Sequence, residues 1–246
     1  MGVDVSHNRI VTFNAEHDHR VVTSIDKNPK IKRIGKNPKV TVFSIYRRTK
    51  TGDYERDGNP LIYALKGLHR YTITNADLYR FRPSFYAILT NTVAKVTQGP
   101  RVVLVMPSSS PLVFQFARKV ARGLGCELIK NAFSKRTAGE MLSDFELAKP
   151  MIKQSHKSDV HKVIAELTKA PVNSIFSMKH VPNRVREYFC PLKMNPQFDV
   201  TVLQEIEVIL VDDLLSTGTT LVSAANELSR FNVSCTQSVC LLSDLS

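Results

Sequence analysis

The sequence predicts an α/β fold in which helices flank a mostly parallel, twisted sheet. Two apolar runs, 102–106 and 208–211, show no alternation of polar and apolar residues, which is typical of strands buried on both faces of a parallel sheet. A tight turn or loop and then a helical pattern follow each run, and the first run begins a βαβ unit that should be right-handed. The length of 246 residues allows one large domain of this class.

The elements expected before the first buried run are a strand and two helices. Residues 40–46 are rich in β-branched and aromatic side chains and predict a strand, and a turn is expected at 51–53. Leucine and isoleucine recur at helical spacing over 60–68, with Asn59 as the N-cap and a proline at the first helical position. A second helix is expected over 85–96.

The elements around the two buried runs complete the predicted sheet. The apolar face of 112–124 predicts a helix, and two glycines mark its end. A short strand is expected to follow at 126–129. After the second run, a helix is expected around 221–228 and the last strand at about 233–242.

Residues 131–195 form a polar, basic stretch that prolines interrupt. Helical segments are expected near 138–148 and 159–169. We interpret this stretch as an insertion or mobile lid, a helical hood on a single domain over 51–246, rather than as a second domain.

The positive charge is concentrated near the N-terminus. The chain has 34 Lys and Arg against 22 Asp and Glu, a formal net charge of +12, and residues 1–50 are especially basic. The tetrapeptide Lys-Asn-Pro-Lys occurs at 27–30 and again at 36–39, and its prolines exclude a continuous helix. We expect a basic N-terminal arm or hairpin that meets the phosphates of a nucleic acid or of a small substrate. The alternative is a solvated loop that aids solubility.

Composition excludes several classes of protein. The chain is 43% apolar and 23% charged, values of a globular protein rather than of a disordered or collagen-like one. The longest apolar run is about half of the roughly 20 residues that cross a bilayer, and the N-terminus lacks a signal-peptide pattern. The four cysteines include no Cys-x-x-Cys pair. We therefore expect a cytoplasmic protein with reduced thiols and no membrane partner.

The chemistry is concentrated at 208–221. The buried strand delivers Asp212 and Asp213 to the sheet edge where open α/β folds bind ligands. The small residues that follow begin a helix, so unsatisfied backbone N–H groups and the helix dipole form a phosphate cradle. Gly218 has no side chain and therefore lets a ligand approach the backbone closely. The hydroxyl donors of this cradle are Ser216, Thr217, Thr219 and Thr220. Two carboxylates beside a phosphate cradle suit a sugar phosphate, because the carboxylates can accept hydrogen bonds from the sugar hydroxyls or bind a cation that accompanies the ligand. The alternative is a capped helix start with two surface aspartates.

Two common phosphate motifs are absent, since the loop has neither the Gly-Lys-Ser/Thr ending of a P-loop nor a Gly-x-Gly-x-x-Gly pattern. Instead, 208–221 resembles the 5-phosphoribosyl-1-pyrophosphate (PRPP) motif of type I phosphoribosyltransferases. The order of elements is similar to that of the ComF-like branch: 61–67 resembles its early helix, and 102–107 resembles its strand before the pyrophosphate loop.

The resemblance implies an activity, the transfer of ribose 5-phosphate from PRPP to a nitrogenous base or related nucleophile with release of pyrophosphate. It implies that Asp212 and Asp213 bind the ribose hydroxyls and that 216–220 holds the 5′-phosphate. It also implies a cofactor, Mg²⁺, which bridges the ribose hydroxyls and the pyrophosphate. The protein then contributes mainly positioning and charge stabilisation.

The sequence departs from the family at the pyrophosphate loop. Where the family often has Lys or Arg, this chain has Pro107, Ser108, Ser109 and Ser110. Cations must then come from elsewhere. Lys135 and Arg136 lie where the family's mobile catalytic loop begins and are the first candidates, with a solvated surface pair as the alternative. Arg184 and Arg186 are further candidates. Lys66 is a candidate for a contact with the substrate, and a snorkelling helix lysine is the alternative.

Other functions remain open at this stage. The main alternative is a non-catalytic PRPP- or nucleotide-sensing protein that binds nucleic acid through its basic arm, a ComF-like role. A relative of PRPP synthase would need a histidine-bearing ATP flap, which we do not locate. The sequence selects neither the acceptor nor the oligomeric state, so a homodimer stays open.

Overall fold

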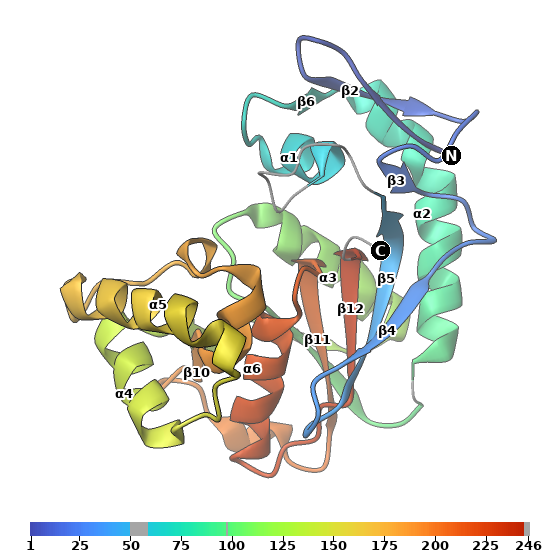
Figure 1. The fold of residues 1–246 in the computed structure, drawn as a ribbon. Helices are drawn as coiled ribbons and strands as arrows, with labels where there is room; N and C mark the ends of the chain where they lie inside the picture. Colours follow the sequence, from blue (N-terminus) through green and yellow to red (C-terminus); the bar gives the residue numbers. More distant parts are fainter. Residues whose placement is uncertain (50–58, 97, 244–246) are drawn as a thin grey trace.

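The computed structural model describes residues 1–49, 59–96 and 98–243. The expected turn at 51–53 and the expected domain boundary after residue 50 lie outside the described residues. The described chain is built around one large sheet with helices on both faces (Figure 1).

The large sheet is seven-stranded and mostly parallel, which confirms the predicted α/β class. Its order is β3-β5-β12-β11-β7-β8, with β4 also paired to β5. The strands from β5 to β8 in this order run parallel, whereas β3 and β4 run antiparallel to β5. The bounds are β3 Val21–Val22, β4 Lys30–Ile34, β5 Val40–Arg48, β7 Arg101–Val105, β8 Glu127–Ile129, β11 Glu207–Leu214 and β12 Gln237–Leu242.

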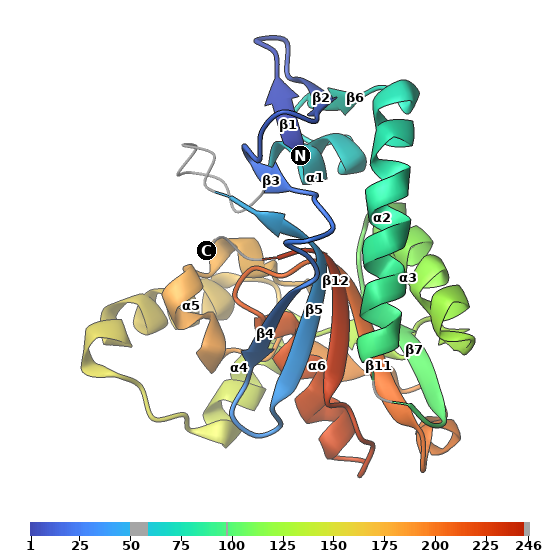
Figure 2. The same cartoon turned by 90° about the vertical axis from the view of Figure 1, so that its right-hand side faces the viewer.

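Two apolar layers sandwich the sheet because alternate residues of each strand face opposite sides. On β11, Ile209 and Val211 belong to the core shared with α1, α2 and α3, whereas Val208 and Leu210 belong to the core shared with α6. Figure 2 shows α2 and α3 on one side of the sheet and α6 on the other. The bounds are α1 Pro60–Lys66, α2 Asn75–Lys95, α3 Pro111–Leu124 and α6 Thr219–Ser229.

The chain leaves two neighbouring central strands in opposite directions. From β7 it passes through α3 to β8, and from β11 it passes through α6 to β12, on the other side of β11. The strands β7 and β11 are parallel and in register, with Val105 opposite Val211. Their carboxyl ends therefore flank a topological switch point, the place where open α/β sheets form their ligand crevice.

Local end signals account for the helix boundaries. The Asn59 side chain accepts a hydrogen bond from the backbone of Leu61 at 3.0 Å, and Ser110 caps α3 in the same way. The helix α2 begins ten residues before the expected start at 85. Its N-cap is Thr74, and Pro83 lies inside it, which hid the first turns from the sequence analysis.

Residues 131–195 carry helices of their own. The two helices expected there are present as α4 Ala138–Ala148 and α5 Lys157–Lys169. They share a small core that includes Met141, Val163 and Phe189. The short strands β9 Phe133–Lys135 and β10 Leu192–Met194 pair with each other, and β10 packs on α6. Short 3₁₀ helices complete this part and the approach to β11: η1 Gln154–His156, η2 Met178–His180, η3 Asn183–Tyr188 and η4 Val200–Leu203.

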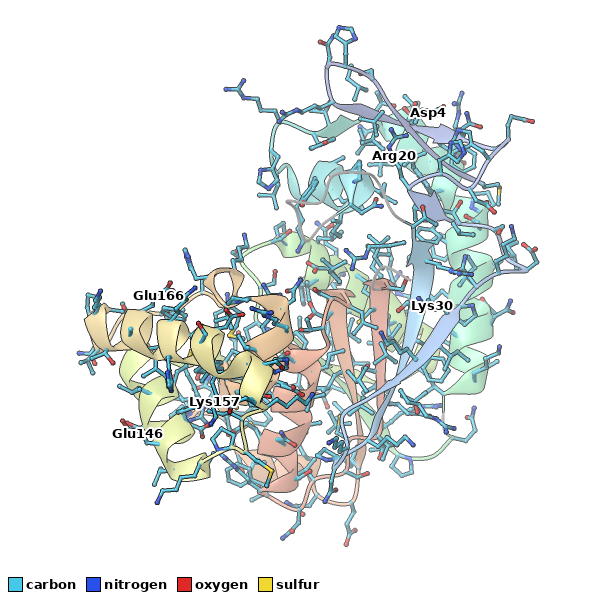
Figure 3. The ribbon with its side chains drawn as sticks, in the orientation of Figure 1. Asp4, Arg20, Lys30, Glu146, Lys157 and Glu166 are labelled. Carbon is cyan, nitrogen blue, oxygen red and sulfur yellow. The ribbon has the colours of Figure 1, made fainter. Side chains whose placement is uncertain are left out.

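The basic N-terminal region is largely built into the fold. β1 Gly2–Val5 and β2 Ile10–Asn14 form a small sheet with β6 Thr72–Ile73. The basic segment around 27–39 forms β4 and its turn into β5, and β5 is an interior strand of the large sheet. Basic side chains are spread out, since Lys30 on β4 and Lys157 on α5 lie on separate parts of the molecule (Figure 3).

Two strand ends differ from expectation. β11 continues past 211 to Leu214, and β12 begins at Gln237 rather than at 233. All four cysteines are unpaired. Among the described helices, none combines the length and the apolar character that crossing a membrane requires.

Candidate functional site

Asp212 and Asp213 lie near the carboxyl end of β11, at the switch point. In Figure 1 the carboxyl ends of β11 and β12 point toward α1. The loop 215–218 then leads directly into α6. Because a parallel strand delivers consecutive side chains to opposite faces, the two acids reach different surroundings.

Asp213 is buried and paired with a lysine from α1. Its side chain is only 6% exposed, and the Lys66 Nζ lies 2.5 Å from its Oδ2, an ion pair rather than a well-directed hydrogen bond. Burial raises the pKa of Asp213, and the Lys66 charge opposes that effect. Lys66, the last residue of α1, thus provides a cation at the site, and its ammonium is in contact with a carboxylate rather than directed to solvent.

Asp212 carries the most strongly perturbed carboxyl group of the pair. Burial and the neighbouring Asp213 charge raise its pKa to about 7, against smaller opposing effects of Lys66 and Lys135. Its Oδ1 accepts a hydrogen bond from the backbone N–H of Asp213 at 2.8 Å. A carboxylate that titrates near neutrality at a sheet edge is typical of functional sites, because a bound cation or donor would compensate it.

The loop before α6 has the backbone conformation of a helix start. Gly218 is the N-cap with a φ of 80°, a region that favours glycine. The Thr217 and Thr219 hydroxyls lie 2.9 Å apart, and the first turn of α6 leaves N–H groups without intrahelical acceptors. A Cβ at position 218 would lie 2.8 Å from the Ile34 Cδ1. The sequence predicts that a glycine is needed here so that a phosphate can approach closely. The structure adds two other reasons, the positive φ of Gly218 and its close packing against Ile34 of β4.

A small cavity covers this loop. It has a volume of about 60 Å³ and is lined by Asp212, by 214–221, and by two residues from the 131–195 stretch, Met178 and Arg186. Arg186 is buried and donates from Nε to the Val181 carbonyl at 2.9 Å. The turns η2 and η3 therefore close over the loop. Arg186 was a candidate from the sequence, whereas no sequence signal marked Met178.

The serine-rich loop lies beside the acids. The backbone N–H of Met106 donates to the Val211 carbonyl at 3.0 Å, which ties the base of this loop to β11 next to Asp212. Ser110 caps α3, its N–H donates to the Ser108 hydroxyl at 3.1 Å, and Ser108 and Ser109 are exposed. The loop Pro107–Ser110 therefore offers hydroxyls and N–H groups at the switch point, but no cation of its own.

Lys135 and Arg136 occupy different surroundings. Lys135 ends β9 with an exposed side chain, and its charge lowers the pKa of Asp212. Arg136 donates to the Leu192 carbonyl at 2.7 Å and pairs with Glu227 at 2.8 Å.

Arg136 also pairs with Asp144, at 3.1 Å, so its charge is neutralised between α4 and α6. Arg184 is exposed and pairs with Asp159 at 2.5 Å. The contacts of Arg136 thus tie the 131–195 stretch to α6, and its guanidinium is engaged with two carboxylates rather than with the acid pair. Lys66 contacts Asp213 directly, and the charge of Lys135 acts on Asp212.

Arg48, which the sequence analysis did not single out, supports the loop from behind. It is buried at the end of β5 and donates from Nη2 to the Leu215 carbonyl at 3.2 Å. Its Nε donates to the Ser243 carbonyl, and its backbone N–H donates to the Ser243 hydroxyl at 2.9 Å. One side chain thus joins the ends of β5 and β12 to the residue before Ser216. The only sequence signal is a charged residue closing an apolar strand.

The donor set is compatible with a magnesium ion that arrives with its ligand. The described residues contain no cluster of three or more His, Cys, Asp or Glu side chains that could hold a metal by themselves. Mg²⁺ is commonly held by one or two carboxylates together with substrate phosphates, and Asp212 and Asp213 are two carboxylates that would be available for this role.

The fold and site together define an α/β protein with an acid pair at the switch point of its sheet, between a helix-start loop and a serine-rich loop. Neither a protein-family model nor a curated protein matches the chain.

Proposed function

We propose that the protein is a magnesium-dependent phosphoribosyltransferase. It would transfer the ribose 5-phosphate of PRPP to a nitrogenous base or related nucleophile and release pyrophosphate. The observation that carries this proposal is one juxtaposition: Asp212 and Asp213 stand at the switch point, between a helix-start loop on one side and the serine loop 107–110 on the other. A sugar carrying phosphates at both ends matches acids between two anion-binding loops.

Each part of the site has a role in this reaction. Ionised Asp212 and Asp213 accept hydrogen bonds from the ribose hydroxyls, and 216–220 holds the 5′-phosphate. The loop 107–110 holds the pyrophosphate. Asp212 and Asp213 would also hold Mg²⁺ together with the substrate, and the ion would supply charge neutralisation. The bond from ribose C1 to pyrophosphate breaks with its electron pair leaving on the pyrophosphate. A bond from C1 to the acceptor nitrogen forms, and the proton of that nitrogen is released to solvent.

Lys66 and Lys135 supply the positive charge that the serine loop lacks. Lys66 neutralises Asp213, 2.5 Å from its carboxylate. When the ribose hydroxyls and a cation occupy Asp213, the Lys66 ammonium becomes free to contact the leaving pyrophosphate. This exchange keeps the buried carboxylate compensated in both states, which a buried charge requires.

Ligand entry requires a change in the 131–195 stretch. The cavity of about 60 Å³ is much smaller than the roughly 300 Å³ or more of typical ligand sites. Met178 and Arg186 must therefore move away from the loop for PRPP to bind. After binding, the same turns can close again and exclude water from the reacting carbon.

Pyrophosphate release tests the proposal. The full chain is incubated with PRPP, Mg²⁺ and a panel of acceptors (adenine, guanine, uracil and orotate), and pyrophosphate is measured. We expect release with at least one acceptor, lost without Mg²⁺ and in Asp212→Asn/Asp213→Asn. Binding of PRPP without release with any acceptor would contradict the enzymatic part and favour the second candidate.

The second candidate is a non-catalytic PRPP- or nucleotide-sensing protein that binds nucleic acid. The net charge of +12 and the exposed basic residues Lys32 and Arg33 on β4 favour it. This candidate predicts that the protein binds RNA or DNA in a salt-sensitive way, and that the binding is lost when the lysines and arginine of 27–39 are neutralised.

A further inference from the structure

A second, larger cavity lies on the α2–α3 face of the sheet and shares no residue with the cavity over the phosphate loop. Its volume is about 370 Å³, within the range of small-molecule sites. It opens between α2 and α3, which pack against each other (Figure 2). The first turns of both helices contribute, so the cavity lies near the carboxyl edge of the sheet. Its apolar walls include Tyr46, Leu61, Leu65, Phe81, Phe85 and Phe116.

The mouth of this cavity is cationic and aromatic. The Arg82 guanidinium carbon lies 5.1 Å from the centre of the Tyr79 ring and 5.8 Å from that of the Tyr86 ring. The Lys119 Nζ donates to the Tyr86 hydroxyl at 2.8 Å and lies 5.1 Å from its ring centre. This hydrogen bond lowers the pKa of Tyr86. The two rings therefore hold two positive charges at the rim.

These positive charges lack an acidic partner. Over 1–49, 59–96 and 98–243, neither Arg82 nor Lys119 forms an ion pair with a carboxylate, and no Asp or Glu lines the cavity. By contrast, Arg80 on the same helix lies 3.7 Å from Asp77. An apolar, aromatic cavity with uncompensated cations at its mouth is complementary to a ligand with an apolar body and an anionic head.

We propose that this cavity binds an aromatic carboxylate. The ring system packs among Phe81, Phe85 and Phe116, where edge and face contacts between aromatic rings favour a flat aromatic body over a flexible chain. The carboxylate meets Arg82 and Lys119. The site is separate from the proposed phosphoribosyl chemistry and does not depend on it.

Calorimetric titration of the full chain with 2-naphthoate tests the proposal, with the neutral 2-naphthalenemethanol as the matched ligand. We expect 2-naphthoate to bind at least tenfold more tightly than the alcohol. We expect Arg82→Met and Lys119→Met each to weaken 2-naphthoate binding about tenfold, the effect of one hydrogen bond to a charged group. Arg118→Met is the matched control, because Arg118 lies next to Lys119 on α3 but stacks over Phe114, outside the cavity.

A blocking variant tests the position of the ligand. Leu78 is half-buried on the cavity wall, so Leu78→Trp fills existing space, and a cooperative thermal transition shows that the variant folds. We expect it to abolish 2-naphthoate binding, and we expect Asp212→Asn/Asp213→Asn to leave that binding unchanged. Absent binding, equal affinity for the alcohol, or equal weakening by Arg118→Met and Lys119→Met would each overturn the proposal.

Discussion

Replacing Asp212 by asparagine is expected to stabilise the fold above neutral pH. Burial and the Asp213 charge raise the pKa of Asp212 from 3.8 to about 7. The folded state therefore holds this proton more tightly than the unfolded state does. The stability it contributes is fully present below about pH 3.8 and is lost as the pH rises through about 7. Asparagine stays neutral throughout, and its Oδ1 still accepts the hydrogen bond from the Asp213 backbone, which is 2.8 Å long in the parent.

The magnitude follows from the two pKa values. The interval from 3.8 to about 7, at 1.36 kcal/mol for each pH unit, corresponds to about 4 kcal/mol. The Asp212 side chain keeps partial contact with solvent, which reduces this value, so we expect about 2 kcal/mol. For a chain of this size that free energy raises Tm by about 4–8 °C at pH 8.

Thermal unfolding followed by circular dichroism between pH 4 and pH 8 measures the effect. The Tm advantage of Asp212→Asn should be smallest near pH 4 and largest at pH 8. Asp199→Asn is the control: Asp199 also accepts a backbone hydrogen bond, from Thr201 at 3.0 Å, but is exposed and has a lowered pKa. We expect no stabilisation from it. A variant at position 212 no more stable than the parent at pH 8 would refute the reasoning.

Three further changes test other parts of the site. Lys66→Met leaves Asp213 buried without its ion pair, and we expect a loss of about 3 kcal/mol in urea unfolding at pH 8; an unchanged unfolding free energy would mean that the pair is not formed. Arg136→Met should cost a similar free energy but leave the PRPP affinity unchanged in calorimetry, and a tenfold weaker affinity would show that Arg136 contributes to the site. Gly218→Ala should lower the free energy of unfolding by about 2 kcal/mol, because position 218 has a positive φ and a new Cβ would contact Ile34 of β4. The loss should exceed that of Gly67→Ala, whose Cβ would meet open space, and equal losses would contradict the close packing.

The parts of the fold that local sequence controls were predictable. Buried parallel strands must be uniformly apolar, which identified β7 and β11. Helix ends depend on a few residues, so Asn59 marked the start of α1 and Gly125 the end of α3 correctly. The order strand, acids, small residues and helix is also local. For that reason the sequence alone predicted the candidate phosphate loop and its position at a sheet edge.

The parts that depend on distant contacts were not predictable in this way. The sequence showed that Lys66, Lys135 and Arg136 are cations, but only the packing of α1 and α4 decides which of them faces the acids. The contact of Arg48 with Leu215 joins strands far apart in the chain. The pairing of the N-terminal strands was also not predictable, because the sequence of one strand does not identify the strand that it pairs with.

The measurement that tests the central claim most directly is a calorimetric titration of the full chain with PRPP, with and without Mg²⁺. The parent protein is compared with Asp212→Asn/Asp213→Asn, whose folding is checked by its thermal transition. We predict binding of PRPP that requires Mg²⁺ and is lost in the folded double variant. No binding to the parent under either condition, or the same affinity in the double variant, would contradict the assignment of this site.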